Sequence, residues 1–276
     1  GAGNHNMESA TENAAFLLKL DKNGNFKWAV QPGGYANNSN LDKKRPFGFD
    51  SEGNIYLAYH FSNTIDFNPK EEETLLTADD MWPDIFIQKL DTLGNLLWVK
   101  QIGGADEEGF GGLHVDNSGN LLITGYFTGT VDFDAGNNVY ELFAGDEWNR
   151  ALFIAKYNSE GNLMWAHPVN WSENDGSWPY GNGFDLTADL SGNVISVGQF
   201  NGKYNFNPNG TPSVLNANGD NYTGYIVKLN GISSGSNFID NDLAVQYFPN
   251  PFSEKITVSV SQSLQNAELW LRSVSG

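Results

Sequence analysis

Three short segments of this chain each place two oxygen-bearing side chains on either side of an aromatic residue. They are Asp66-Phe67-Asn68, Asp132-Phe133-Asp134 and Asn205-Phe206-Asn207. In an extended segment, side chains at i and i+2 share one face, and Ca²⁺ prefers carboxylate, amide and carbonyl oxygens. The spacing makes Asp132, Asp134 and Asp66 candidate calcium ligands. The same side chains could instead cap a loop by accepting backbone hydrogen bonds.

A second candidate site is a group of aromatic residues. The segment WSENDGSWPYGNG, residues 171–183, contains Trp171, Trp178 and Tyr180. Rigid rings on a loop, mixed with Asn, Asp and Ser, can stack on a sugar ring. Trp82 and Trp148 precede apolar segments and could join the same face. The alternative is that these rings pack onto the protein surface without a ligand.

Short Asp/Asn-x-x-Gly-Asn segments recur along the chain and at first suggest a metal site. The copies are DKNGN from Asp21, DSEGN from Asp50, DTLGN from Asp91, DNSGN from Asp116, NSEGN from Asn158 and DLSGN from Asp189. An EF-hand loop needs several carboxylates and a Glu at its twelfth position, which these segments lack. Asp or Asn at the first position and a glycine that accepts positive φ instead predict tight hairpin turns.

Catalytic motifs are not evident. The histidines His5, His60, His114 and His167 lack metal-site spacing, and no G-x-S-x-G, P-loop or dinucleotide fingerprint is present. The many acidic residues leave a glycosidase-type carboxylate pair open, because such a pair is assembled in space. Nothing in the sequence selects one.

Composition narrows the class of protein. Charged residues make up 17% of the 276 residues, 31 are Gly, and the formal net charge is −18. The acidic balance argues against nucleic-acid binding, because phosphate contacts require Lys and Arg. The chain has no Cys, which removes disulfides, Cys-ligated zinc and thiol nucleophiles. No apolar stretch approaches the roughly 20 residues that span a bilayer.

The turns punctuate a longer repeat. Trp28, Trp98 and Trp165 recur about every 70 residues, and each follows one of the turns. Each unit predicts four antiparallel strands in sequence order, which is typical of a β-propeller blade. We therefore predict an all-β fold, with the repeated Trp packed between blades and Phe pairs six residues apart in the core. The pairs are Phe61/Phe67, Phe127/Phe133 and Phe200/Phe206.

The repeat predicts about three to four blades in residues 13–230, preceded by an N-terminal tail at 1–12. Known propellers close with about four or more blades. The N-terminal hairpin and the C-terminal strands could share a blade, the ring could close by pairing with a second copy, or the chain could be an incomplete piece. An open strand edge would need covering.

The repeat resembles the seven-bladed β-propeller repeat family of secreted bacterial proteins. The matching segments are TVDFDAGNNV, ALFIAKYNSEGNLMWAHPV, DIFIQKLDTLGNLLWVKQIGG and HVDNSGNLLITGYF. The resemblance implies a secreted propeller without a catalytic signature. Because the chain has fewer units than that family, a homodimer of half-rings would approach the family's number.

The C-terminal part differs in character. Residues 231–242, GISSGSNFIDND, are small and polar and predict a linker. Residues 243–276, from LAVQYFPNPFSEKITVSV to AELWLRSVSG, resemble the start of the C-terminal sorting domain of the type IX secretion system of Bacteroidetes. The resemblance implies a small β module, truncated relative to that family, and the secretion machinery as a partner.

These features together predict a secreted or cell-surface, non-enzymatic binding or structural module with an unidentified protein or glycan partner. A carbohydrate-binding protein that uses the loop from Trp171 to Tyr180 is the first alternative. A glycoside-acting enzyme on a propeller is the second. Calcium is the one possible cofactor.

Overall fold

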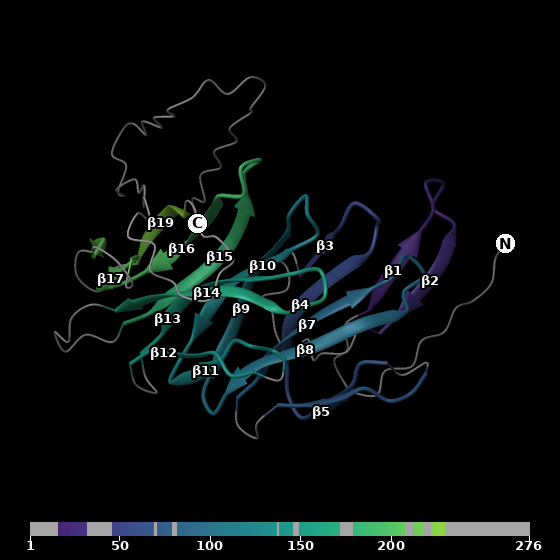
Figure 1. The fold of residues 1–276 in the computed structure, drawn as a ribbon, viewed down its shortest axis with the longest axis horizontal. Helices are drawn as coiled ribbons and strands as arrows, with labels where there is room; N and C mark the ends of the chain where they lie inside the picture. The colour runs from purple at the N-terminus through teal and green to yellow at the C-terminus, as the bar shows by residue number, and fades with distance from the viewer. Residues whose placement is uncertain are drawn as a thin grey trace.

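The computed structural model describes residues 16–31, 46–68, 71–78, 82–136, 138–145, 149–171, 179–207, 212–217 and 222–229. Every regular element in these ranges is a β-strand, so the predicted all-β class is confirmed. The hairpins and sheets follow one another from the N-terminal hairpin at one side to the last strands at the other (Figure 1). No described helix is long and apolar enough to cross a membrane. The proposed tail at 1–12, the linker at 231–242 and the segment at 243–276 lie outside the described residues.

The long strands form antiparallel units in sequence order. The first two strands, β1 (Leu17–Leu20) and β2 (Phe26–Val30), make a hairpin. Unit 1 consists of β3 (Phe47–Phe49), β4 (Ile55–Phe61), β7 (Asp84–Leu90) and β8 (Leu96–Gly104). Unit 2 consists of β9 (Glu108–Val115), β10 (Leu121–Phe127), β13 (Ala151–Tyr157) and β14 (Leu163–Trp171). Unit 3 consists of β15 (Gly181–Ala188), β16 (Val194–Phe200) and β19 (Thr223–Leu229).

A small hairpin follows the second strand of each unit and is counted with that unit. These hairpins are β5 (Thr64–Asp66) with β6 (Leu75–Thr77), β11 (Thr130–Asp132) with β12 (Glu141–Phe143), and β17 (Lys203–Asn205) with β18 (Val214–Asn216). Strand β11 of unit 2 pairs with β8 of unit 1, and β17 of unit 3 pairs with β14 of unit 2. Two sheets therefore have six strands, each drawn from two consecutive units. Four strands per blade is thus too few for these two sheets, because β11–β12 and β17–β18 each extend the preceding sheet, whereas β5–β6 forms a separate two-stranded sheet.

The Asp/Asn-x-x-Gly-Asn segments are hairpin turns, as predicted. The Asp116 Oδ1 atom accepts the backbone N–H groups of Ser118 and Asn120 at 2.9 Å each, and its Oδ2 atom accepts the Asn120 amide at 2.9 Å. The glycine of all six turns has φ between 76° and 83°, a region that L side chains avoid. Each first-position side chain therefore accepts hydrogen bonds within its own turn.

A lysine of the third strand in each unit secures the turn that joins the first two strands. Lys156 Nζ lies 2.8 Å from Asp116, and the same contact joins Lys89 to Asp50 and Lys228 to Asp189. Burial alone would raise the pKa of Asp116, but the hydrogen bonds from Lys156 and Asn120 lower it below the usual value. Lys89, Lys156 and Lys228 therefore have a structural role.

The paired phenylalanines form the core between strand and hairpin, as predicted. The rings of Phe127 and Phe133 are 5.5 Å apart, and Phe153 packs against both. Phe61/Phe67 and Phe200/Phe206 repeat the contact at 5.5 and 5.7 Å. Aromatic residues bury more apolar surface than most other side chains and so contribute most to such a core.

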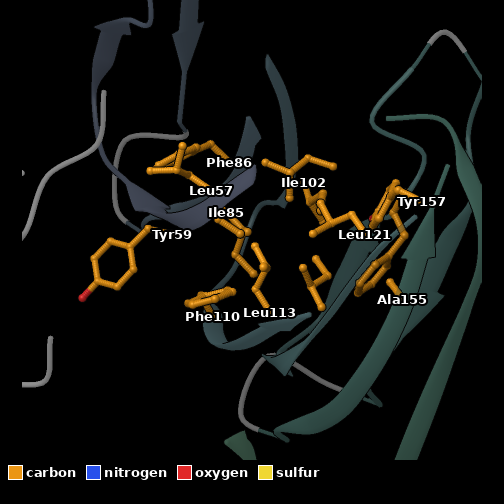
Figure 2. Packing of buried hydrophobic residues seen from close by; sticks show 14 of the residues in the cluster. Leu57, Tyr59, Ile85, Phe86, Ile102, Phe110, Leu113, Leu121, Ala155 and Tyr157 are labelled. Atoms are coloured by element: carbon orange, nitrogen blue, oxygen red, sulfur yellow. The ribbon is translucent and has the colours of Figure 1, made fainter. Parts of the chain in front are cut away.

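Successive units pack face to face. Ile85 and Ile102 of unit 1 share one buried cluster with Leu113 and Leu121 of unit 2 (Figure 2). The prediction that the repeated tryptophans lie between units is confirmed for Trp28 and Trp98. Their indole N–H groups donate at 3.1 Å to turn carbonyls of the next unit, and the donor–acceptor pairs are Trp28 with Thr92 and Trp98 with Ser159. Trp165 is buried in the second core cluster.

Candidate binding face

In units 1 to 3, the described small hairpins follow the same end of the second strand, that is of β4, β10 and β16. The Asp/Asn-x-x-Gly-Asn turns lie at the opposite end, because the strands are antiparallel and joined in order. We call the other end the loop face. It is defined by the strand ends that the register aligns, namely Phe61 with Asp84, Phe127 with Glu108 and Ala151, and Phe200 with Gly181 and Thr223.

An arginine clamped between two tyrosines is the most elaborate feature of the loop face. The Arg150 guanidinium lies 4.1 Å from the centre of the Tyr126 ring and 4.5 Å from that of Tyr180. Tyr126 is the penultimate residue of β10, Arg150 precedes β13 and Tyr180 precedes β15, so units 2 and 3 both contribute. A partly buried cation–π contact of this kind is worth about 1 kcal/mol. We call these three residues the Tyr–Arg–Tyr stack.

Glu107 completes the charge balance of the stack. Its carboxylate accepts a hydrogen bond from the Tyr126 hydroxyl at 2.8 Å and pairs with the Arg150 guanidinium at 2.5 Å. Burial alone would lower the pKa of Arg150, but the tyrosine hydroxyls and the Glu107 carboxylate raise it above the usual value. Arg150 therefore stays charged at every ordinary pH.

The stack carries an exposed aromatic edge. The ring of Tyr222 meets that of Tyr180 edge to face at 5.3 Å, and Tyr222 is 55% exposed. The Tyr180 backbone N–H donates to Asn201, and Asn201 in turn donates its backbone N–H to the Tyr180 carbonyl. Tyr180 is thus fixed in place, and Tyr222 offers a ring to solvent beside it.

The other predicted aromatic residues are less well assembled. Trp82 is exposed just before β7, and Trp171 is half-buried at the end of β14, where the register pairs it with Tyr204. No ring contact within the described part of the chain joins either tryptophan to Tyr180. Trp148 and Trp178 lie outside the described residues, so their membership of the site stays a prediction.

The predicted calcium ligands are engaged with backbone. The Asp132 Oδ1 atom accepts the N–H groups of Asp134 and Tyr140, at 2.9 and 2.8 Å. Asp66 does the same for Asn68 and Thr74, and Asp134 accepts the N–H of Gly136. Asp66 and Asp132 therefore hold the two ends of a small hairpin loop, and Asp134 stabilises a turn within its loop. Within the described ranges, no three His, Asp or Glu side chains are grouped to hold a metal ion.

Two carboxyl groups meet in the interior beneath the loop face. Asp84 begins β7 and Glu108 begins β9, and each is 2% exposed. The Gln101 amide donates to Asp84 and to the Thr77 carbonyl. Burial raises the pKa of Glu108 to about 10, and the charges of Asp84 and Asp106 and a hydrogen bond to Asp84 act in the same direction. At neutral pH Glu108 is therefore protonated, and the pair lies in the interior of the protein.

Sequence reasoning missed the partners that complete the stack and the buried acid pair. Glu107, Tyr126 and Arg150 lie on three different segments, and only pairing of β9 with β10 and of β10 with β13 brings them together. The available signals were weak. Arg150 is one of three arginines in the chain, and an acidic run at 106–108 directly precedes a glycine-rich segment. Either feature could have marked a charged site.

Comparison with known proteins gives one distant relative to report and no match to a protein-family model. The chain is 25% identical over 235 residues to an uncharacterized WD repeat-containing protein of Acanthamoeba polyphaga mimivirus. The match covers 77% of this chain and 16% of that protein, so the chain spans about a sixth of the relative's length. This distant homology is consistent with a β-propeller repeat family. The chain is therefore an all-β repeat protein of antiparallel sheets, distantly related to a WD repeat-containing protein.

Proposed function

We propose that the chain is a β-propeller module that binds a ligand at its loop face and has no catalytic role. Three observations support the propeller: antiparallel units that repeat in sequence order, the repeated tryptophan contact between consecutive units, and the distant WD repeat relative. In propellers, blades of four antiparallel strands are arranged radially. The rigid stack of sheets then supports the loops that contact a ligand.

The observation that carries the binding role is the Tyr–Arg–Tyr stack with the exposed ring of Tyr222 beside it. The stack holds Tyr180 in place before a ligand binds, so little conformational entropy of the Tyr180 side chain is lost on binding. Flat aromatic rings next to polar groups suit the apolar face of a sugar. We therefore propose a glycan as the ligand class, with Tyr180 and Tyr222 as the platform and Trp178 as a predicted neighbour.

Replacing Tyr222 by Ala is expected to weaken glycan binding about 10-fold, because the apolar area that its ring would bury against a sugar is worth about 1.4 kcal/mol. A glycan array first identifies the best-bound sugar, and calorimetry then compares the variant with the wild type. Leu190→Ala is the matched control, since Leu190 is 95% exposed in a turn at the opposite end. An array on which the wild-type protein binds no sugar would rule out the glycan proposal.

We also propose that the protein acts outside the cell. The support is the resemblance of residues 243–276 to a type IX sorting domain. If the protein is displayed on the surface, proteinase K added to intact cells of the source bacterium should digest it, as followed with an antibody. Protection in intact cells and digestion only after lysis would contradict surface display.

A further inference from the structure

The two ends of the array of units expose apolar side chains that the repeat buries everywhere else. On β1, Phe16, Leu18 and Leu20 are 68%, 45% and 48% exposed. Strand β1 can be aligned with β7 by matching Lys19 and the turn from Asp21 to Lys89 and the turn from Asp91. In this alignment, the three β1 residues are equivalent to Phe86, Gln88 and Leu90 of unit 1, and to the corresponding residues of units 2 and 3. No equivalent in the three units is more than 4% exposed.

These β1 side chains point toward the position of a preceding unit. Lys19, on the other face of β1, donates to the Thr92 carbonyl of the following unit. The glycine of the β1–β2 turn supports the same assignment. A Cβ on Gly94 would meet the ring of Trp28, and one on Gly161 would meet that of Trp98, whereas one on Gly24 would meet nothing within 4 Å. In units 1 and 2, this turn packs against a tryptophan of the preceding unit, whereas the β1–β2 turn has no such neighbour at Gly24.

The far face of unit 3 is the complementary end. Strands β4 and β10 are buried on almost every residue, whereas β16 alternates between buried and half-buried positions. On β19, Ile226 is 46% exposed, although its equivalents Ile87 and Ile154 are at most 1% exposed. Phe184, which is also exposed, occupies the bulge position that Gly111 fills at the junction between units 2 and 3.

We propose that these two end faces dock on each other between two copies of the chain, head to tail. The β1 face, which consists of Phe16, Leu18 and Leu20, is equivalent to the faces that contact a preceding unit elsewhere in the array. The Ile226 face, which consists of Ile226 and Phe184, is equivalent to the faces that contact a following unit. Units of a repeat array bury their apolar faces only against neighbours, so terminal faces need a cap or a partner. Two different faces that fit each other make a heterologous contact, which closes a ring or extends a chain according to its rotation.

Charge sets a condition on this association. Each copy carries a formal net charge of −18, so two copies repel each other at long range at low salt. Added salt screens that repulsion and leaves the apolar contact intact. The fraction of associated protein should therefore rise when sodium chloride is raised from about 0.05 to 0.5 M, where the Debye length falls to a few ångströms.

Sedimentation of the full chain across a concentration series tests the proposal. The wild type should show at least twice the monomer mass, and Leu18→Asp and Ile226→Asp should each weaken association at least about 30-fold, because each places a charge in an apolar contact. Leu93→Asp, in an exposed turn of unit 1, is the control and should associate like the wild type. Leu20→Lys serves as a second β1 variant if Leu18→Asp does not fold.

Mixing the two variants distinguishes head-to-tail docking from other arrangements. The intact Ile226 face of the Leu18→Asp chain can meet the intact β1 face of the Ile226→Asp chain, so the mixture should associate where each variant alone does not. If two β1 faces met each other, Ile226→Asp would associate normally, and the mixture would show no gain. That result, or a wild type that stays monomeric at both salt concentrations, would overturn the proposal.

Discussion

Replacing Phe153 with Ala is expected to lower the free energy of unfolding by about 3–5 kcal/mol, the range for a fully buried phenylalanine. Phe153 is completely buried, and its ring lies 5.0 Å from that of Phe133 and 6.4 Å from that of Phe127. Removal of the ring leaves a cavity between β13 and the loop that follows β11. The surrounding strands are paired on both sides and cannot collapse into it.

Urea denaturation followed by tryptophan fluorescence and by circular dichroism measures this effect. Phe143→Ala provides the matched control, because Phe143 is an exposed phenylalanine on β12 and its loss should change stability by less than about 0.5 kcal/mol. Phe153→Leu keeps most of the volume and supplies a milder variant if the alanine variant does not fold. Similar losses for Phe143→Ala and Phe153→Ala would show that the phenylalanine pairs are not the core of the unit.

The second large effect concerns Glu108, and its sign depends on pH. The folded pKa of Glu108 is about 10, above the ordinary value of 4.5, so the folded protein holds a proton that the unfolded chain releases. The stability associated with that proton is fully present below about pH 4.5 and is lost as pH rises toward 10. By pH 7 the loss is about 3 kcal/mol, since each pH unit in this window costs about 1.4 kcal/mol.

Glu108→Gln should remove this dependence. A Gln amide is neutral at every pH, as the protonated carboxyl is at neutral pH, and it also carries a hydrogen-bond donor. The stability of the variant relative to the wild type should therefore be about 3 kcal/mol greater at pH 7 than at pH 4. Urea titrations at both pH values measure the difference, with exposed Glu141→Gln as the control. Equal differences at the two pH values would mean that Glu108 is ionised in the folded protein.

The elements that the sequence predicted well are those whose chemistry is local. A turn such as Asp116 to Asn120 contains its own hydrogen-bond donors, acceptors and glycine, so five residues suffice to specify it. The phenylalanine pairs and the repeated tryptophans were predicted because their spacing recurs. Repetition in itself indicates a structural role, and the positions of Trp28 and Trp98 between units confirm it.

The elements that the sequence did not predict depend on pairing between distant segments. Strand β11 is three residues long, and nothing within it states that its partner is β8 of the preceding unit. The candidate site shows the same limit. Tyr180 stood out as an aromatic residue outside the repeat, but its neighbours Arg150 and Tyr126 come from other strands. The predictions for Trp148, Trp178 and the sorting segment stay open.

The repeat, its turns and the residues that pack between units can be read from the chain, because a hairpin and a periodic apolar pattern are encoded over a few adjacent residues. Which charges meet and which apolar faces stay exposed depends on how distant segments pack. Phe16, Leu18 and Leu20 have the same residue character as their buried equivalents. Burial of a side chain depends on whether a neighbouring unit is present, and that information lies outside the residue's own strand.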